Sequence, residues 1–211
     1  MFGESNDNIL HQFYAYHGTD EESSIYILSD GFKIFSDNRD DHWLGNGVYF
    51  FREDETQALF WAQNKVRKVE KLNGKPAVVI RALIAVNSDN YLNMDSRDGL
   101  DIFEKHLEQT EKELKESGLQ ITFKNENQQR HYFMNLLPDK YHVIKRTFNV
   151  NSKKYDSNKH LADIKLWLKG EQICIRNLST IKNIKVTRIE KLKVVVKKSP
   201  NKKPRLLHWI S

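Results

Sequence analysis

The chain of 211 residues contains little cysteine, proline or glycine: one Cys, four Pro and nine Gly. The single cysteine, Cys174, excludes an internal disulfide and a cysteine-rich zinc site. With 39% hydrophobic residues, this composition also excludes collagen-like and low-complexity chains, and it predicts a packed core. The most apolar segment, residues 76–86, is about half as long as a membrane span and contains Arg81. The first residues, MFGESNDN, lack the basic and then apolar pattern of an export signal, so we expect a cytoplasmic protein.

Charge is present in quantity but is unevenly distributed. The net charge is +6, yet residues 1–63 hold 3 Lys/Arg against 12 Asp/Glu, whereas residues 182–211 hold 10 against 1. A strongly basic end on a chain whose first segment is acidic is typical of a surface that binds a polyanion such as nucleic acid. It is equally typical of lysines that merely solvate a terminal strand and tail, and the sequence leaves both interpretations open.

The order of secondary-structure signals favours an α+β fold. Strands are predicted at residues 12–16, 48–51, 77–86, 173–175 and 184–196, from β-branched and aromatic content and from alternation of apolar and polar residues. Helices are predicted after Thr19 or Asp20, after Asp54 or Thr56, over residues 100–117, where Asp98 can act near the start, and over about residues 128–137. The rest of residues 119–160 carries no pattern that we can assign.

The common catalytic templates are absent from the sequence. It contains no Walker A loop, no Rossmann glycine fingerprint, no HExxH and no GxSxG. The eight histidines are scattered without the spacing of metal ligands, so no metal site is expected.

Three short motifs remain, and they are far apart. The first is Tyr16-His17-Gly18-Thr19, the second is Gly45-Asn46-Gly47-Val48-Tyr49-Phe50 with Phe60 eleven residues after Tyr49, and the third is Glu171-Gln172-Ile173. This set resembles the His-Tyr-Glu branch of the ADP-ribosyltransferase fold, which includes diphtheria-toxin-like and poly(ADP-ribose)-polymerase-like enzymes. The resemblance covers about a third of the chain, over residues 13–63 and 170–188. It implies a split antiparallel β-sheet core with flanking helices, and it leaves residues 87–168 unassigned.

The resemblance implies a site that cleaves the nicotinamide–ribose bond of NAD, a reaction with an oxocarbenium-like transition state. In this site the catalytic residues are His17, Tyr49 and Glu171. Gly18 grips the carboxamide through its backbone, Tyr49 and Phe60 stack on the nicotinamide, and Glu171 stabilises the developing charge. His17 binds the adenosine ribose with support from Thr19. For the pyrophosphate, the cation-poor first segment offers Arg39 as the first choice. NAD is then a co-substrate, and no metal is required.

The predicted domain organisation is a single catalytic domain over residues 1–198, with a helical insertion at about 95–165 and a basic tail at 199–211. RNA is the acceptor that the sequence favours over DNA. The nucleic-acid-binding candidates are the pair near the third motif and the basic residues of the C-terminus: Trp167, Lys169, Lys197, Lys198, Lys202, Lys203 and Arg205. Trp167 and Lys169 also fit a core tryptophan and a solvated lysine.

Other functions fit the same residues. A transferase that modifies a protein side chain needs the same NAD site, and a nucleic-acid-binding module could retain this fold without turnover. A small transferase with a basic tail also resembles the toxin of a bacterial toxin–antitoxin or phage-defence system, which implies an antitoxin protein as a partner.

Overall fold

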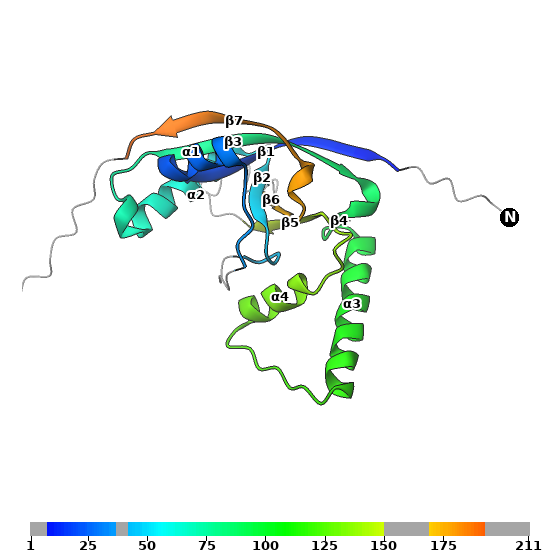
Figure 1. Ribbon diagram of the computed structural model, residues 1–211. Coiled ribbons are helices and arrows are strands. Elements are labelled where there is room, and N and C mark those ends of the chain that lie inside the picture. Colours follow the sequence, from blue (N-terminus) through cyan, green and yellow to red (C-terminus); the bar gives the residue numbers. More distant parts are fainter. Residues whose placement is uncertain (1–7, 37–41, 150–168, 193–211) are drawn as a thin grey trace, which may run out of the picture.

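The computed structural model describes residues 8–36, 42–149 and 169–192, and these form one seven-stranded sheet with four helices (Figure 1). The strands are β1 (Leu10–Asp20), β2 (Val48–Arg52), β3 (Ala77–Asn87), β4 (Tyr91–Asn93), β5 (Val143–Asn149), β6 (Lys169–Ile175) and β7 (Ile181–Glu190). The helices are α1 (Glu21–Asp30), α2 (Glu55–Lys68), α3 (Arg97–Glu116) and α4 (Glu126–Asn135). Single 3-10 turns lie at Glu70–Leu72, Ser88–Asn90 and Leu178–Thr180.

Each of the four helices starts at a side chain that caps its first turn. Asp20, Asp54, Ser96 and Asn125 each accept a hydrogen bond from the backbone N–H three residues later. Such a bond satisfies an N–H that has no partner inside the helix. Of the expected alternatives, Asp20 and not Thr19 caps α1, and Asp54 and not Thr56 caps α2. Asp98, expected near the start of α3, lies in its first turn, where its charge favours the helix dipole.

The strand order is β4-β5-β6-β2-β1-β3-β7. The neighbouring strands are antiparallel except for β4 and β5, which are parallel. The α+β class is therefore confirmed, and the sheet expected to have an antiparallel core is a mixed one, with a parallel pair at its edge. The reason is that α3 and α4 connect β4 to β5 and return the chain in the same direction (Figure 1).

The range expected to be a helical insertion, residues 95–165, contains α3 and α4 but also β5. β5 is an integral strand, because it pairs with β6 over its full length, from Val143 opposite Ile175 to Asn149 opposite Lys169. The described part of this range thus consists of two helices, over residues 97–135, followed by a strand of the sheet. Residues 150–168 and the predicted tail at 199–211 lie outside the described residues.

Pairing defines two faces of the sheet, because residues directly opposite each other on neighbouring strands point to the same side. Phe50 lies opposite Ile173, and we call their side the Phe50 face. Tyr49 lies opposite Cys174, and we call that side the Tyr49 face. Each face is covered by a separate set of elements.

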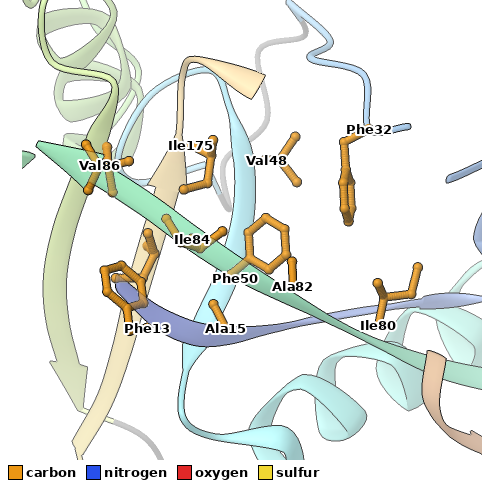
Figure 2. Packing of buried hydrophobic residues seen from close by; sticks show 12 residues of the cluster. Phe13, Ala15, Phe32, Val48, Phe50, Ile80, Ala82, Ile84, Val86 and Ile175 are labelled. Carbon is orange, nitrogen blue, oxygen red and sulfur yellow. The ribbon is translucent and has the colours of Figure 1, made fainter. Parts of the chain in front are cut away.

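The Phe50 face carries the largest hydrophobic cluster. Figure 2 shows Phe13 and Ala15 of β1 beside Phe50 of β2 and the aliphatic side chains of β3, with Phe32 approaching from the segment after α1. Phe50, Ile80 and Ile84 have no exposed surface. Burying large apolar side chains from several strands at once stabilises the sheet by about 1.5–3 kcal/mol for each side chain.

The Tyr49 face is covered in two places. α2 packs across β1 and β3 through Ala58, Ala62 and Val66, and the loop between β4 and α3 joins α4 in covering the other end. At that end Met94 and Met134 pack on Ile144 and Cys174, and burial raises the pKa of the Cys174 thiol to about 12. The start of β2, which carries Tyr49, lies between the regions that α2 and α4 cover.

The sheet splits between β1 and β2. Their pairing consists of Ala15 with Arg52 and Tyr16 with Phe51, and the backbone carbonyl of Tyr14 also accepts from the Glu53 N–H at 3.1 Å. Beyond Tyr16, β1 continues along β3 while β2 continues along β6. Since backbone groups alternate in direction along a strand, Gly18 directs its N–H and C=O to the same side as Tyr14, toward β2. Within the described residues no strand pairs with Gly18 on that side.

Across residues 8–36, 42–149 and 169–192, no helix combines the length and apolar character that a membrane crossing requires.

Candidate functional site

The three motifs lie on three neighbouring strands in the middle of the sheet. β1 ends in His17-Gly18-Thr19, β2 carries Tyr49, and β6 carries Glu171, and the order β6-β2-β1 is consecutive. Hydrogen-bonded pairing of β2 with both neighbours brings these segments together although they are far apart in the chain. The split between β1 and β2 lies next to Gly18 and Tyr49.

His17 bridges the split. Its Nδ1 lies 2.8 Å from the backbone carbonyl oxygen of Tyr49, and its ring contacts Phe32 and Phe50 on the Phe50 face. A carbonyl oxygen only accepts, so Nδ1 carries the proton, and in the neutral ring Nε2 is an acceptor. Burial lowers the pKa of His17 to about 4, against the opposing effect of this hydrogen bond, and the charge of Lys65 lowers it further. At neutral pH His17 is therefore an uncharged acceptor.

Gly18 is required by the packing of α2. A Cβ atom at this position would overlap the backbone carbonyl oxygen of Ala58 and crowd the backbone nitrogen of Ala62. The absence of a side chain thus lets the helix approach β1 closely. This reason for glycine is independent of any ligand, and it leaves the N–H and C=O of Gly18 directed into the split.

Tyr49 anchors the loop that precedes its own strand. Its hydroxyl donates to the carbonyl of Gly45 at 2.8 Å and accepts from the Leu44 N–H at 2.8 Å, and its ring stacks on His42 at 4.9 Å. Gly45 has a φ of 83°, and a Cβ there would meet Asn135 of α4. The Gly45-Asn46-Gly47 motif is therefore a tight loop that is fixed by the hydroxyl of Tyr49 and packs against α4.

Glu171 lies in a chain of alternating charges. Its Oε1 is 3.3 Å from Nη1 of Arg52, and its Oε2 is 3.2 Å from Nζ of Lys145. Lys145 also contacts Asp95 at 3.0 Å, and Asp95 contacts Nε of Arg146 at 3.6 Å. The Lys145 side chain is only 13% exposed, so the Glu171–Lys145–Asp95 part of the chain is shielded from bulk water more than an ordinary surface pair.

Two further side chains, Thr147 and Tyr91, adjoin this chain of charges. Asp95 accepts hydrogen bonds from the N–H and hydroxyl of Thr147, and these bonds together with Lys145 outweigh the effect of burial, so the pKa of Asp95 is lowered. Burial, reinforced by the charge of Glu171, raises the pKa of Tyr91 to about 12, and Arg52 opposes this rise. Tyr91 is therefore a neutral hydrogen-bonding group at physiological pH.

Sequence reasoning missed Lys145, Asp95 and Tyr91. All three lie in or beside β4 and β5, in a region without an assigned pattern, and β4 is only three residues long. The β-branched and aromatic residues of Val143–Asn149 are a signal for a strand, but apolar and polar residues do not alternate along it. The convergence of the three missed residues on Glu171 comes from strand pairing and has no local signature.

The strand register places the three triad candidates on different faces. His17 contacts Phe50, and Glu171 precedes Gln172, which lies opposite Phe51, so His17 and Glu171 are on the Phe50 face. Tyr49 is on the other face and packs against the cluster around α4. The structure thus brings His17 and Tyr49 into direct contact through a backbone hydrogen bond, and it surrounds Glu171 with Arg52 and Lys145 instead.

Thr19 and Phe60 occupy contrasting environments. Thr19 is 1% exposed, and its hydroxyl accepts from Nζ of Lys65 at 3.1 Å, beside the 2.7 Å ion pair of Lys65 with Asp20. Phe60 is 49% exposed, because it lies two residues from Ala58 and so on nearly the opposite side of α2. The aromatic residue of α2 that contacts the sheet is Trp61, whose ring lies 6.3 Å from that of Phe51.

Several predicted contacts fall outside the described residues. These are Arg39 and the nucleic-acid candidates Trp167, Lys197, Lys198, Lys202, Lys203 and Arg205. Lys169 begins β6 and pairs with Asn149, but its side chain is not described. Among the described residues, no group of three or more His, Cys, Asp or Glu side chains is arranged to hold a metal ion.

A polar hollow of about 680 Å³ lies beside the Gly45–Gly47 loop. The lining residues come from the segment after α1, the loop, the end of α4, the segment between α4 and β5, and the segment after β6: Ile34, Asn46, Asn135, Asp139, His142, Arg176, Asn177 and Leu178. The backbone N–H of Asn46 donates to Oδ1 of Asn135 at 2.6 Å, while the buried Oδ1 of Asn46 has no hydrogen-bond partner within the described part of the chain. The volume is in the range of small-molecule sites.

The chain is similar to a protein of known sequence. An uncharacterized protein of the archaeon Methanocaldococcus jannaschii is 25% identical over 194 residues, which cover 83% of this chain and 87% of that protein. No family model matches the chain, and neither does any solved structure.

Proposed function

We propose that this protein has the ADP-ribosyltransferase fold, and that it cleaves NAD at the nicotinamide–ribose bond and transfers ADP-ribose to nucleic acid, with RNA as the favoured acceptor. The observation that carries the proposal is the consecutive order β6-β2-β1, in which the sheet splits beside Gly18. A backbone edge with a directed N–H and C=O is suited to a carboxamide, which offers one acceptor and two donors. The hydrogen-bonding capacity of nicotinamide thus matches the edge of β1.

The remaining roles follow from the surroundings of each residue. The unprotonated Nε2 of His17 is suited to accept a hydrogen bond from a ribose hydroxyl. Tyr49 lies beside the split and holds the loop that borders the polar hollow. Replacing Tyr49 should therefore affect both the proposed NAD site and this loop. The hollow has room for a nucleoside portion of the dinucleotide.

In this proposal Glu171 stabilises the positive charge that develops on the ribose. Its carboxylate is neutralised by Arg52 and Lys145 in the described structure, so binding of NAD must draw one oxygen away from its cation. The cation on the other oxygen would then hold the carboxylate in a fixed orientation rather than leave it free to rotate. The proposed physiological role is that of a cytoplasmic toxin restrained by an antitoxin protein.

The same two ion pairs favour a second candidate, a nucleic-acid-binding module without turnover. A carboxylate with a cation at each oxygen is also what a purely structural group looks like, because both charges are already compensated. The two candidates differ in whether Glu171 contributes to a reaction of NAD.

The test is release of nicotinamide from NAD by the purified chain, measured by chromatography. Glu171→Gln keeps the shape of the side chain and removes its charge, so we expect the rate to fall by about 10²–10³-fold, the usual loss for one electrostatic group. Glu111→Gln on the exposed surface of α3 removes the same charge elsewhere and should leave the rate unchanged. Circular dichroism checks that both variants are folded. An unchanged rate in Glu171→Gln, or no NAD turnover by the wild type, favours the non-catalytic candidate.

The acceptor is tested separately. NAD labelled in the adenylate phosphate is incubated with the protein and a whole-cell lysate, and the product is treated with RNase or with protease. Label that is lost to RNase supports RNA as the acceptor. Label that resists RNase and is lost to protease indicates transfer to a protein side chain.

A further inference from the structure

Part of the Tyr49 face lies beyond the reach of α2. The helix packs from Tyr16 onward, where Ala58 and Ala62 approach Gly18. Toward the start of β1 the exposure rises, to 46% at Tyr14 and 54% at Leu10. An aromatic ring on an open stretch of sheet is available to a partner, whereas Phe51 under α2 and the phenylalanines of the Phe50 face are buried.

Three cations lie on the same side of the sheet as this ring, on the next two strands, β3 and β7. The guanidinium carbon of Arg81 lies 4.3 Å from the centroid of the Tyr14 ring. Lys185 of β7 lies opposite Arg81, and Lys182 lies opposite Leu83, which in turn lies opposite Tyr14. Both lysines are exposed. We call Tyr14, Arg81, Lys182 and Lys185 the Tyr14 platform.

These cations are not compensated by carboxylates. Among the described residues, Arg81, Lys182 and Lys185 form no ion pair, whereas Arg188, further along β7, pairs with Glu190 at 3.5 Å. Nε of Arg81 is buried and has no hydrogen-bond partner within the same ranges. A surface with three uncompensated positive charges attracts a polyanion, and the attraction grows as salt is lowered.

We propose that the Tyr14 platform binds single-stranded RNA. An unpaired base stacks on the Tyr14 ring beside Arg81, and the backbone phosphates contact Lys182 and Lys185. A single strand is favoured over a duplex because a duplex presents no free base face to an exposed ring. The chain also continues from this face, since Leu192 packs on the α2 cluster and the lysine-rich residues 193–205 follow in the sequence.

This inference rests on the proposed function only in making the bound RNA the acceptor, because the binding itself requires no NAD. It is tested with the full-length protein and a fluorescein-labelled 12-nucleotide RNA, by anisotropy at three salt concentrations without NAD. Two phosphate contacts predict a log–log salt slope of about −1.4 from the platform alone. Lys182→Gln with Lys185→Gln should flatten the wild-type slope by about 1.4, since each contact contributes about 0.7.

Lys105→Gln with Lys115→Gln is the matched control, because it removes the same charge from the exposed surface of α3. The control should retain the wild-type slope. Equal slopes for the wild type and the Lys182/Lys185 variant would overturn the platform, and so would an equal flattening in the control.

Tyr14→Ser tests the stacked base. It should weaken binding by about tenfold while leaving the salt slope unchanged, because it removes a ring and no charge. Duplex RNA of the same length should bind more weakly than the single strand, and Tyr14→Ser should leave the affinity for the duplex unchanged. Equal affinity for the duplex, or for poly-glutamate, with no effect of Tyr14→Ser, would show a general anion surface and overturn the proposal.

The two proposals fail in different ways. If NAD turnover is present and depends on Glu171 but the RNA affinity is unaffected by the platform variants, the proposal of RNA binding by the Tyr14 platform is wrong and the proposal of NAD cleavage is supported. If platform-dependent RNA binding is present and NAD turnover is absent, the enzyme is wrong and the platform stands.

Discussion

Gly18 shows how a single residue can satisfy a structural demand and a proposed functional one together. Its lack of a side chain admits the backbone of α2, and its N–H and C=O face the split between β1 and β2. Because the obstacle to a side chain is the backbone oxygen of Ala58, no change of side chain on α2 can make room.

Gly18→Ala is therefore expected to destabilise the fold by about 1–3 kcal/mol, the usual range for overpacking a tight site. Urea unfolding measures this loss. Ala58→Gly, combined with it, should fail to restore stability because the clashing atom belongs to the backbone. Recovery in the double variant would show that the side chain of Ala58 is the obstacle instead.

His17 makes a prediction about pH. Its pKa is about 4 in the folded protein and 6.5 ordinarily, so between these values the unfolded chain binds more protons than the folded one. Stability should then decrease as pH falls from 6.5 to 4, by at most about 3 kcal/mol from this group. Asp20, whose pKa is about 2 because bonds from Lys65 and Ser23 outweigh burial, loses its contribution only at lower pH.

His17→Asn keeps a donor near Tyr49 and removes the titration. The variant should show a shallower decrease of unfolding free energy between pH 6.5 and pH 4, measured by urea titration at several pH values. Some slope should remain from His106, whose pKa is also lowered by burial. Identical slopes in wild type and variant would mean that His17 titrates normally in the folded protein.

Among the elements, α2 illustrates how helix geometry selects between neighbouring aromatic residues. Its buried side carries Ala58, Ala62 and Val66, a spacing of four residues that defines one face of a helix. Trp61 borders this face and contacts Phe51, while Phe60 points outward. An aromatic residue at the expected distance from Tyr49 is thus present, but the helix turns it toward solvent.

Phe60→Ala should change the free energy of unfolding by less than about 0.5 kcal/mol, as exposed substitutions usually do. Trp61→Ala, the matched comparison on the same helix, should cost about 2 kcal/mol because its ring packs on the sheet. Thermal or urea unfolding measures both. A loss of NAD affinity in Phe60→Ala at unchanged stability would indicate that its ring contacts the ligand.

In the whole molecule, the charge cluster around Glu171 links strands that are distant in sequence. Arg52 and Glu171 are 119 residues apart, and Lys145 joins Glu171 to Asp95 at the end of β4. Two carboxylates share one ammonium group, so removing the cation leaves like charges facing each other in a half-buried site.

Lys145→Met is expected to destabilise the protein by about 2–4 kcal/mol, because it breaks two partly buried ion pairs at once. Asp95→Asn should restore part of this loss, since it removes one of the two repelling charges and its amide oxygen can still accept from Thr147. A double-mutant cycle in urea measures the coupling. Additive effects would mean that Lys145 does not couple the two carboxylates.

Most of the helices and the strands β1, β2 and β3 could be predicted from the sequence. Caps at Asp20 and Asp54, and apolar residues at helical spacing in α3, act within a few residues of one another. Such interactions are local and therefore leave a pattern in the chain. The three motif segments could also be identified in the sequence as candidate site segments, because each contains its own turn or strand signal.

Tertiary structure alone decided the strand order, the parallel pairing of β4 with β5, and the faces on which the motif residues lie. Tyr49 and Glu171 point to opposite faces because a strand alternates at every residue, so the register of β2 against β6 determines the outcome. Glu171 meets Arg52 and Lys145 for the same reason, through pairing with two strands from distant parts of the chain. Register follows from burying both faces of the sheet at once, and no local segment contains that information.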